Sequence, residues 1–169
     1  MFCEIYSLPK KSTQRTLLLD RDNTIIHDDG YFHDVNSIEF LDDDFDFIEL
    51  LCRKNISVFL ISNQSGIGRG IFELKDALSV NRAIAEFWSS NKGQLNGAIF
   101  CPHTPQDACQ CRKPSPAMLE MAISLSGSSK SNTLFIGDSP SDFSAANNAN
   151  ISFVQARKNG VRELLLDWI

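Results

Sequence analysis

The sequence predicts a three-layer α/β domain built on a five-stranded parallel sheet. Short apolar segments alternate along the chain with segments whose apolar residues recur at helical spacing. Such alternation is typical of a parallel sheet covered by helices on both faces. In these sheets ligands bind beyond the carboxyl ends of the strands. We therefore expect the functional residues to follow Leu19, Ile61, Phe100 and Ile136.

Five segments are predicted as strands: Thr16–Asp20, Ile56–Ser62, Gly97–Cys101, Thr133–Gly137 and Ile151–Val154. The second of them is almost entirely apolar and rich in β-branched residues, as buried parallel strands are. Residues 1–15 are expected to form a lead-in to this sheet. The 169 residues suffice for one domain with a full core, so residues 1–169 are predicted to form a single domain.

Five further segments are predicted as helices: Asp42–Asn55, Glu73–Ser90, Pro116–Ser126, Ser141–Asn148 and Gly160–Asp167. The first places Phe45, Ile48 and Leu51 at helical spacing. Asp42 precedes them and is expected to cap this helix.

The composition is that of an ordinary globular protein and selects no substrate. The net charge is −5, and no basic stripe is present, which argues against nucleic acid as the main partner. No segment has the length of a membrane span, and a proline and two lysines interrupt the N-terminal residues early. We expect a cytoplasmic monomer that acts on a small molecule.

Two carboxylates, Asp20 and Asp22, follow the first predicted strand. One can attack phosphorus, while the other passes a proton to the leaving group and later activates water. A turn or a helix cap is the structural alternative, because aspartate is frequent in both. After the fourth strand, Asp138 can join Asp20 and Asp22 around a magnesium ion, which prefers oxygen ligands. Asp142 can orient this site or cap the next helix, and the sequence leaves both open.

Two other polar runs can hold phosphate. After the second strand come Ser62, Asn63, Gln64, Ser65 and Gly66. A hydroxyl and successive backbone N–H groups can bind phosphate oxygens there. Lys113 can neutralise a phosphoryl group, and Arg112 offers a planar fork to a second anion. Each run alone is a weak signal, because glycine-rich loops and solvated basic pairs are common.

Three of the five cysteines crowd between positions 101 and 111. Together with His103, the residues Cys101, Cys109 and Cys111 provide three sulfurs and one imidazole, a set that tetrahedral zinc prefers. No ligand position is left open, so we expect a structural site. The alternative is a group of unrelated buried cysteines beside a surface histidine.

Taken together, these motifs resemble those of the haloacid dehalogenase superfamily. DxDxT at Asp20, serine–asparagine at Ser62, RKP at Arg112 and GDxxxD at Gly137 follow in the family's order. The segment CPH…CxCRKPxP narrows the resemblance to the branch of the D-glycero-D-manno-heptose-1,7-bisphosphate and histidinol-phosphate phosphatases. The resemblance implies a Rossmann-like domain with a small zinc loop. It also implies that residues 25–40 form a small flap instead of a large cap domain.

The substrate alternatives rest on shorter runs. Residues 62–72 resemble the heptose enzymes, as do Asp28, Asp29, Gly30 and Tyr31. The short loop between His103 and Cys109 resembles the histidinol enzymes. The polynucleotide 3′-phosphatases resemble residues 63–70, but they are not expected to carry the zinc ligands. The bisphosphate is the expected substrate; histidinol phosphate, a polynucleotide 3′-phosphate and an inactive phosphosugar-binding module remain alternatives.

The resemblance also implies a role for each motif. Asp20 would attack the phosphate and form an aspartyl-phosphate, and Asp22 would act as acid and then as base. Magnesium would be held by Asp20, Asp138 and the backbone carbonyl of Asp22. The transferred phosphoryl group would meet Ser62, Asn63 and Lys113. The rest of the substrate would meet Arg112, Gln64, Ser65 and the flap residues Asp28, Asp29, Gly30 and Tyr31.

Two positions depart from the family pattern. Asn23 stands where the family usually has glycine, and asparagine tolerates a left-handed backbone better than most residues. Ser139 stands where the heptose enzymes often have lysine, which removes one phosphate contact.

Overall fold

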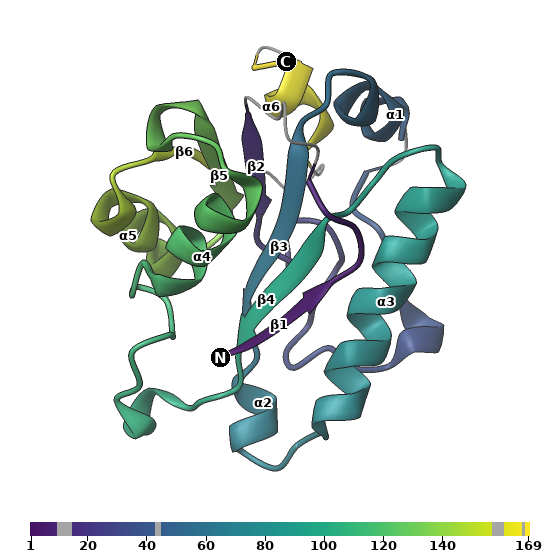
Figure 1. Cartoon of the computed structure of the whole chain (residues 1–169). Coiled ribbons are helices and arrows are strands. Elements are labelled where there is room, and N and C mark those ends of the chain that lie inside the picture. Colours follow the sequence, from purple (N-terminus) through teal and green to yellow (C-terminus); the bar gives the residue numbers. More distant parts are fainter. Residues whose placement is uncertain (10–14, 43–44, 157–160, 167) are drawn as a thin grey trace.

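A six-stranded sheet lies at the centre of the described part of the protein (Figure 1). The computed structural model describes residues 1–9, 15–42, 45–156, 161–166 and 168–169. The strands are β1 (Phe2–Ile5), β2 (Thr16–Leu19), β3 (Ser57–Asn63), β4 (Gly97–Cys101), β5 (Thr133–Gly137) and β6 (Ser152–Gln155). Their order across the sheet is β1-β4-β3-β2-β5-β6, and β2 to β6 run parallel.

The edge strand β1 corrects the prediction of five parallel strands. It pairs antiparallel with β4, with Phe2 opposite Phe100 and Ile5 opposite Gly97. The sequence predicted only a lead-in over residues 1–15, of which 10–14 lie outside the described residues. The strand has four residues and is mostly exposed, so its sequence carries no buried apolar run that would indicate a strand.

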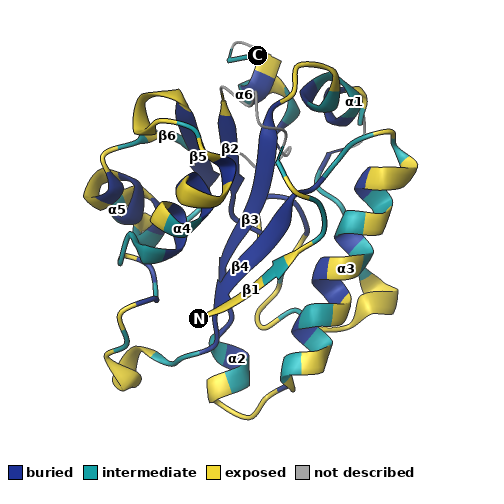
Figure 2. Ribbon diagram, viewed as in Figure 1, coloured by how far each residue is buried: buried dark blue, intermediate teal, exposed yellow. Residues whose placement is uncertain are grey.

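Helices cover both faces of the sheet. Leu17 and Leu19 pack in one apolar cluster with residues of α1 (Asp46–Arg53), α3 (Leu74–Ser90) and α6 (Arg162–Leu166). Leu18 packs in the other cluster with α4 (Ala117–Ser126) and α5 (Pro140–Ala149). Successive strand residues point to opposite faces, so this alternation builds three layers around a buried sheet (Figure 2).

The cap predicted for the first long helix is wrong. α1 begins at Asp46, and the carboxylate of Asp42 instead accepts the backbone N–H groups of Val161 and Arg162, both at 3.0 Å. Asp42 therefore satisfies donors at the start of α6, a segment far away in the sequence. Residues 43, 44, 160 and 167, which belong to two of the predicted helices, lie outside the described residues.

The carboxyl ends of the parallel strands meet at one edge, and short elements surround it. The predicted glycine-rich loop after β3 is in part a short helix, α2 (Ser65–Gly68). A Cβ atom on Gly68 would lie 2.7 Å from the carbonyl oxygen of Pro102. This close approach places α2 against the segment that follows β4. Three 3-10 helices complete the described elements: η1 (Val35–Ser37), η2 (Pro105–Asp107) and η3 (Lys130–Asn132).

Residues 25–40, the predicted flap, lie between β2 and α1 and contain η1. Ile26 makes bridge pairs with Asp22 and Phe40, which fastens the base of the flap to the end of β2. His33 of the flap stacks on Phe72, with ring centroids 5.1 Å apart. Among the described helices, none is both long enough and apolar enough to cross a membrane.

Candidate active site

Asp20 directly follows β2 and contacts Lys113. The Nζ atom of Lys113 lies 2.5 Å from Oδ1 of Asp20 and 2.6 Å from Oδ1 of Asp142, and it donates to the carbonyl of Ile61 at 2.9 Å. All three charged side chains are buried. Burial raises the pKa of Asp20, and Lys113 opposes this rise. Burial disfavours the ammonium form of Lys113, but Asp20 and Asp142 outweigh that effect, so the pKa of Lys113 is raised and the group keeps its charge.

Three carboxylates lie close together at this edge of the sheet. One oxygen each of Asp20, Asp138 and Asp142 lies within 4.8 Å of the others. Burial, followed by the charge of Asp142, raises the pKa of Asp138. An excess of negative charge with oxygen donors is the environment that a hard divalent cation such as Mg²⁺ prefers. The residues therefore fit the magnesium ion that the family resemblance implies.

Asp142 performs both of the roles that the sequence left open. Its Oδ2 atom accepts the N–H and the hydroxyl of Ser139 at 3.0 and 2.7 Å, in a capping box at the start of α5. Its Oδ1 atom meets Lys113. Ser139, at the position where the heptose enzymes often have lysine, is thus a helix cap in this chain.

The carboxylate of Asp22 is held by Arg21 and Gln64. Arg21 donates to both of its oxygens, from Nε at 2.7 Å and from Nη2 at 3.2 Å. Gln64 donates to Oδ2 at 2.6 Å, and the Ser62 hydroxyl lies 3.4 Å from the same oxygen. The side chain of Gln64, which the sequence assigned to the substrate, is buried and engaged with protein groups. Sequence reasoning did not select Arg21, although a charged residue next to a buried strand is a usable signal.

The remaining phosphate-binding candidates lie around this centre. Asn63 is paired with the backbone of Lys113. Ser65 begins α2 at the end of β3 and is partly exposed. Arg112 donates to the carbonyl of His103 at 3.2 Å, which places its guanidinium next to the cysteine-rich loop.

The flap candidates form a turn beside an open pocket of about 400 Å³. Asp28 accepts the N–H groups of Gly30 and Phe32 at 2.7 and 3.0 Å, so its carboxylate shapes the turn. Asp29 pairs with His27 at 3.1 Å. Gly30 and Tyr31 both have positive φ, and Tyr31 is exposed.

The left-handed conformation expected at Asn23 is confirmed. Its φ is 57°, and its side-chain amide donates to the carbonyl of Asp28 and accepts the N–H of the same residue, at 3.0 and 3.1 Å. Asparagine at this position therefore makes the tight turn and also fastens the flap to the loop that carries Asp20 and Asp22.

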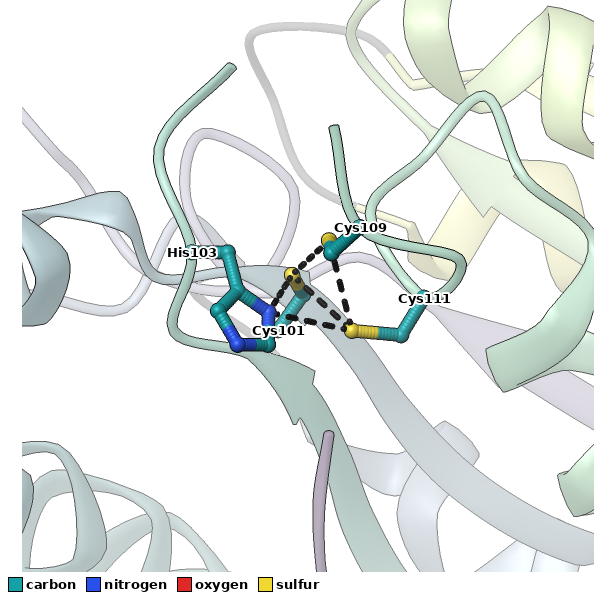
Figure 3. A group of neighbouring side chains, drawn as sticks. All are labelled: Cys101, His103, Cys109 and Cys111. Carbon is teal, nitrogen blue, oxygen red and sulfur yellow. Dashed lines mark hydrogen bonds between the residues drawn. The ribbon is translucent and has the colours of Figure 1, made fainter. Parts of the chain in front are cut away.

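Cys101, His103, Cys109 and Cys111 converge on one point (Figure 3). Five of the distances between their sulfur and Nδ1 atoms lie between 3.2 and 3.6 Å. Four ligands about 2.3 Å from a zinc ion would form a tetrahedron with edges of about 3.8 Å. The group therefore has the donors and nearly the spacing of a closed tetrahedral zinc site.

The backbone around Cys109 favours a thiolate. Burial raises the pKa of this thiol, but the N–H groups of Cys111 and Arg112 point at the sulfur, and the net effect lowers its pKa to about 6. Backbone donors aimed at a sulfur stabilise the deprotonated form, which is the form that binds a metal. At Cys101 the shift is opposite, because burial and the neighbouring thiol of Cys111 raise its pKa to about 12.

Known proteins resemble this chain over most of its length. The sequence model of the HAD-hydrolase-like family matches residues 110–164. The chain is 34% identical over 165 residues to a D-glycero-beta-D-manno-heptose-1,7-bisphosphate 7-phosphatase of Yersinia pestis, covering 90% of this chain and 88% of the relative. It is also 34% identical over 141 residues to the protein of that name from Helicobacter pylori, covering 83% and 82%.

A solved structure shares the fold. The crystal structure of D,D-heptose 1,7-bisphosphate phosphatase from B. bronchiseptica, complexed with magnesium and phosphate, superposes with a TM-score of 0.78 at 23% identity. The match covers 92% of this chain and 100% of that one. The chain has an aspartate pair beyond β2 and a buried lysine, and its relatives match it over most of its length. It therefore belongs to the haloacid dehalogenase-like D-glycero-D-manno-heptose-1,7-bisphosphate 7-phosphatase family and is a phosphatase.

Proposed function

We propose that this phosphatase removes the 7-phosphate of D-glycero-D-manno-heptose 1,7-bisphosphate. The observation that carries the proposal is the contact of Asp20 with Lys113 at the carboxyl edge of the sheet, in a chain whose relatives bear this enzyme's name. We further propose that residues 1–169 act as one domain and as a monomer, in the cytoplasm and without a nucleic-acid partner.

Asp20 is the proposed nucleophile. Its carboxylate attacks phosphorus while the bond to the sugar oxygen breaks, and the product is an aspartyl-phosphate on Asp20. Lys113 holds the transferred phosphoryl oxygens and offsets the repulsion between the carboxylate and the phosphate. Ser62 and Asn63 add polar contacts at the end of β3.

Asp22 is the proposed acid and base. In the first step it gives a proton to the departing sugar oxygen, and in the second it takes a proton from the water that attacks the aspartyl-phosphate. Asp20 and Asp138, with the Asp22 backbone carbonyl, would hold magnesium, which when bound supplies positive charge for the developing phosphoryl oxygens. Asp142 lies beside them and is engaged with Lys113 and Ser139.

The part of the substrate that does not react is assigned to residues that surround Asp20 and Lys113. Arg112 offers two parallel donors to the phosphate that does not react, and the flap residues Asp28–Tyr31 and Ser65 are assigned to the sugar. Gln64, which the sequence assigned to the substrate, is assigned instead to the carboxylate of Asp22. The cysteine–histidine group would hold zinc and thereby shape the loop that carries Arg112, with no part in the chemistry.

The decisive experiment compares two substrates. The purified chain should release phosphate from the heptose bisphosphate with a kcat/KM at least about tenfold above that for histidinol phosphate, and only with magnesium present. The five-residue loop between His103 and Cys109 is the feature that favours the histidinol compound. A preference for histidinol phosphate would therefore replace the proposed substrate while leaving the phosphatase chemistry in place.

A further inference from the structure

Arg21 stands between the two aspartates in the sequence, yet its side chain has no exposed surface. Removing a guanidinium from water is costly, and an apolar side chain could fill the same volume without that cost. A buried arginine at this position therefore indicates a role for its hydrogen bonds that an apolar side chain could not perform.

Those hydrogen bonds converge on Asp22. The Nε and Nη2 atoms of Arg21 hold both oxygens of the Asp22 carboxylate, at 2.7 and 3.2 Å. Nη2 also lies 2.9 Å from Oε1 of Gln64, whose Nε2 atom donates to Asp22 at 2.6 Å. Nη1 reaches Oδ1 of Asn81 in α3 at 3.4 Å, and Nη2 reaches the carbonyl of Phe32 in the flap at 3.1 Å. Arg21 and Gln64 thus both donate hydrogen bonds to the Asp22 carboxylate, while acceptors in α3 and the flap hold the guanidinium of Arg21 in place.

The two oxygens of Asp22 are held unequally. Among the described residues, Oδ2 faces three donors, from Arg21, Gln64 and Ser62, whereas Oδ1 faces one, the Nε–H of Arg21. A carboxylate oxygen offers about two lone pairs, so Oδ1 alone retains room for a proton. The Asp22 side chain is 18% exposed, which leaves it reachable from the site.

We propose that Arg21, supported by Gln64, is a positioning residue that fixes the orientation of Asp22 so that Oδ1 transfers the proton. The inference rests on the proposed function, in which Asp22 is acid and base. In the first step the proton leaves Oδ1 for the sugar oxygen as its bond to phosphorus breaks and Asp20 forms the aspartyl-phosphate. In the second step Oδ1 takes a proton from water as water displaces Asp20 from phosphorus.

The test uses the dependence on the leaving group. An alkyl phosphate needs a proton on its leaving oxygen, whereas 4-nitrophenyl phosphate has a leaving group that departs without one. The kcat/KM value reports only the steps up to the aspartyl-phosphate, so the later action of Asp22 as base does not enter. Arg21→Lys keeps the charge but loses the fork. We expect it to lower kcat/KM for the alkyl phosphate at least about tenfold more than for the aryl phosphate.

A double-variant cycle separates positioning from general damage. Asp22→Asn removes the acid, so adding Arg21→Lys to it should leave the alkyl-to-aryl ratio unchanged, because nothing remains to be positioned. Gln64→Met removes the second donor without changing side-chain length much, and it should shift the ratio in the same direction. If Arg21→Lys does not fold, the ratio measured for Gln64→Met tests the positioning role instead. Arg82→Lys, which alters an exposed arginine–carboxylate fork to Glu4, should leave the ratio at the wild-type value.

Equal losses for the two substrates in Arg21→Lys and Gln64→Met would overturn the positioning role. The positioning role would also be overturned if adding Arg21→Lys to Asp22→Asn changed the alkyl-to-aryl ratio of kcat/KM further. If the wild-type chain cannot hydrolyse alkyl phosphates at all, the proposed function fails instead, so the two failures are distinguishable.

Discussion

The carboxamide of Asn63 forms two hydrogen bonds with the backbone of Lys113. Its Nδ2 atom donates to the Lys113 carbonyl at 3.2 Å, and its Oδ1 atom accepts the Lys113 N–H at 3.0 Å. The end of β3 is thereby tied to the loop that carries the lysine, fifty residues further along the chain. The place of the ammonium beside Asp20 depends on this pair as well as on the side chain of Lys113 itself.

Asn63→Ala should therefore impair catalysis through Lys113. Losing both hydrogen bonds should cost about 1–3 kcal/mol of unfolding free energy, and displacement of the ammonium should lower kcat by roughly 10- to 100-fold. Asn63→Asp keeps the acceptor but loses the donor, so its kcat and its stability should lie between those of the wild type and Asn63→Ala. Urea unfolding and steady-state phosphate release provide the measurements. Full kcat in Asn63→Ala would show that Asn63 does not position the lysine.

Asp20→Asn should abolish turnover and leave the fold intact. The amide cannot act as the nucleophile and lacks the negative charge that a metal ligand needs here. The fold should survive because Lys113 keeps its ion pair with Asp142, at 2.6 Å. Intact-protein mass spectrometry should detect no aspartyl-phosphate, and the circular dichroism spectrum should match the wild type. Appreciable activity in a clean preparation would contradict the assignment of the nucleophile.

Arg112→Ala should impair the heptose bisphosphate more than a small monophosphate. Its guanidinium is held beside the site through the His103 carbonyl, and charge-assisted bonds to a second phosphate are typically worth about 1.5–3 kcal/mol, or roughly 10- to 150-fold in kcat/KM. Arg82→Ala is the matched control, since it removes the same charge from a surface ion pair with Glu4. Equal losses for both substrates would instead indicate a contact with the transferred phosphate.

The cysteine–histidine group should bind one zinc ion per chain. Four ligands complete a tetrahedron and leave no place for water, so metal analysis should find zinc even after dialysis against magnesium buffer. Cys109→Ser should lower the zinc content and reduce activity, because the loop that carries Arg112 and Lys113 loses its anchor. The unfolding midpoint should fall only in part, because the sheet has its own buried clusters.

Cys3→Ser provides the control for that variant, since Cys3 is an exposed cysteine of β1 outside the group. It should change neither the zinc content nor the activity. A wild-type protein without zinc, whose Cys109 and Cys111 react freely with thiol reagents at no loss of activity, would refute the zinc site.

Local pattern was sufficient for much of the fold. The β-branched apolar run before Asn63 and the helical spacing in α3 are patterns complete within a short stretch of sequence, so sequence alone located these elements. The same holds for the edge at which the site lies, because the carboxyl ends of parallel strands meet there whatever the details of packing. Asp20, Lys113 and Asp138 could be selected before their distances were known.

The tertiary structure decided what depends on segments distant in sequence. Edge strand β1 exists because β4 offers it a pairing partner, and Asp42 caps α6 because folding brings the two together. The orientation of Asp22 likewise depends on Arg21, which is fixed by Gln64 and by Asn81 on another helix. Short-range periodicity carries no information on such contacts, since each is formed only when separate elements pack against one another.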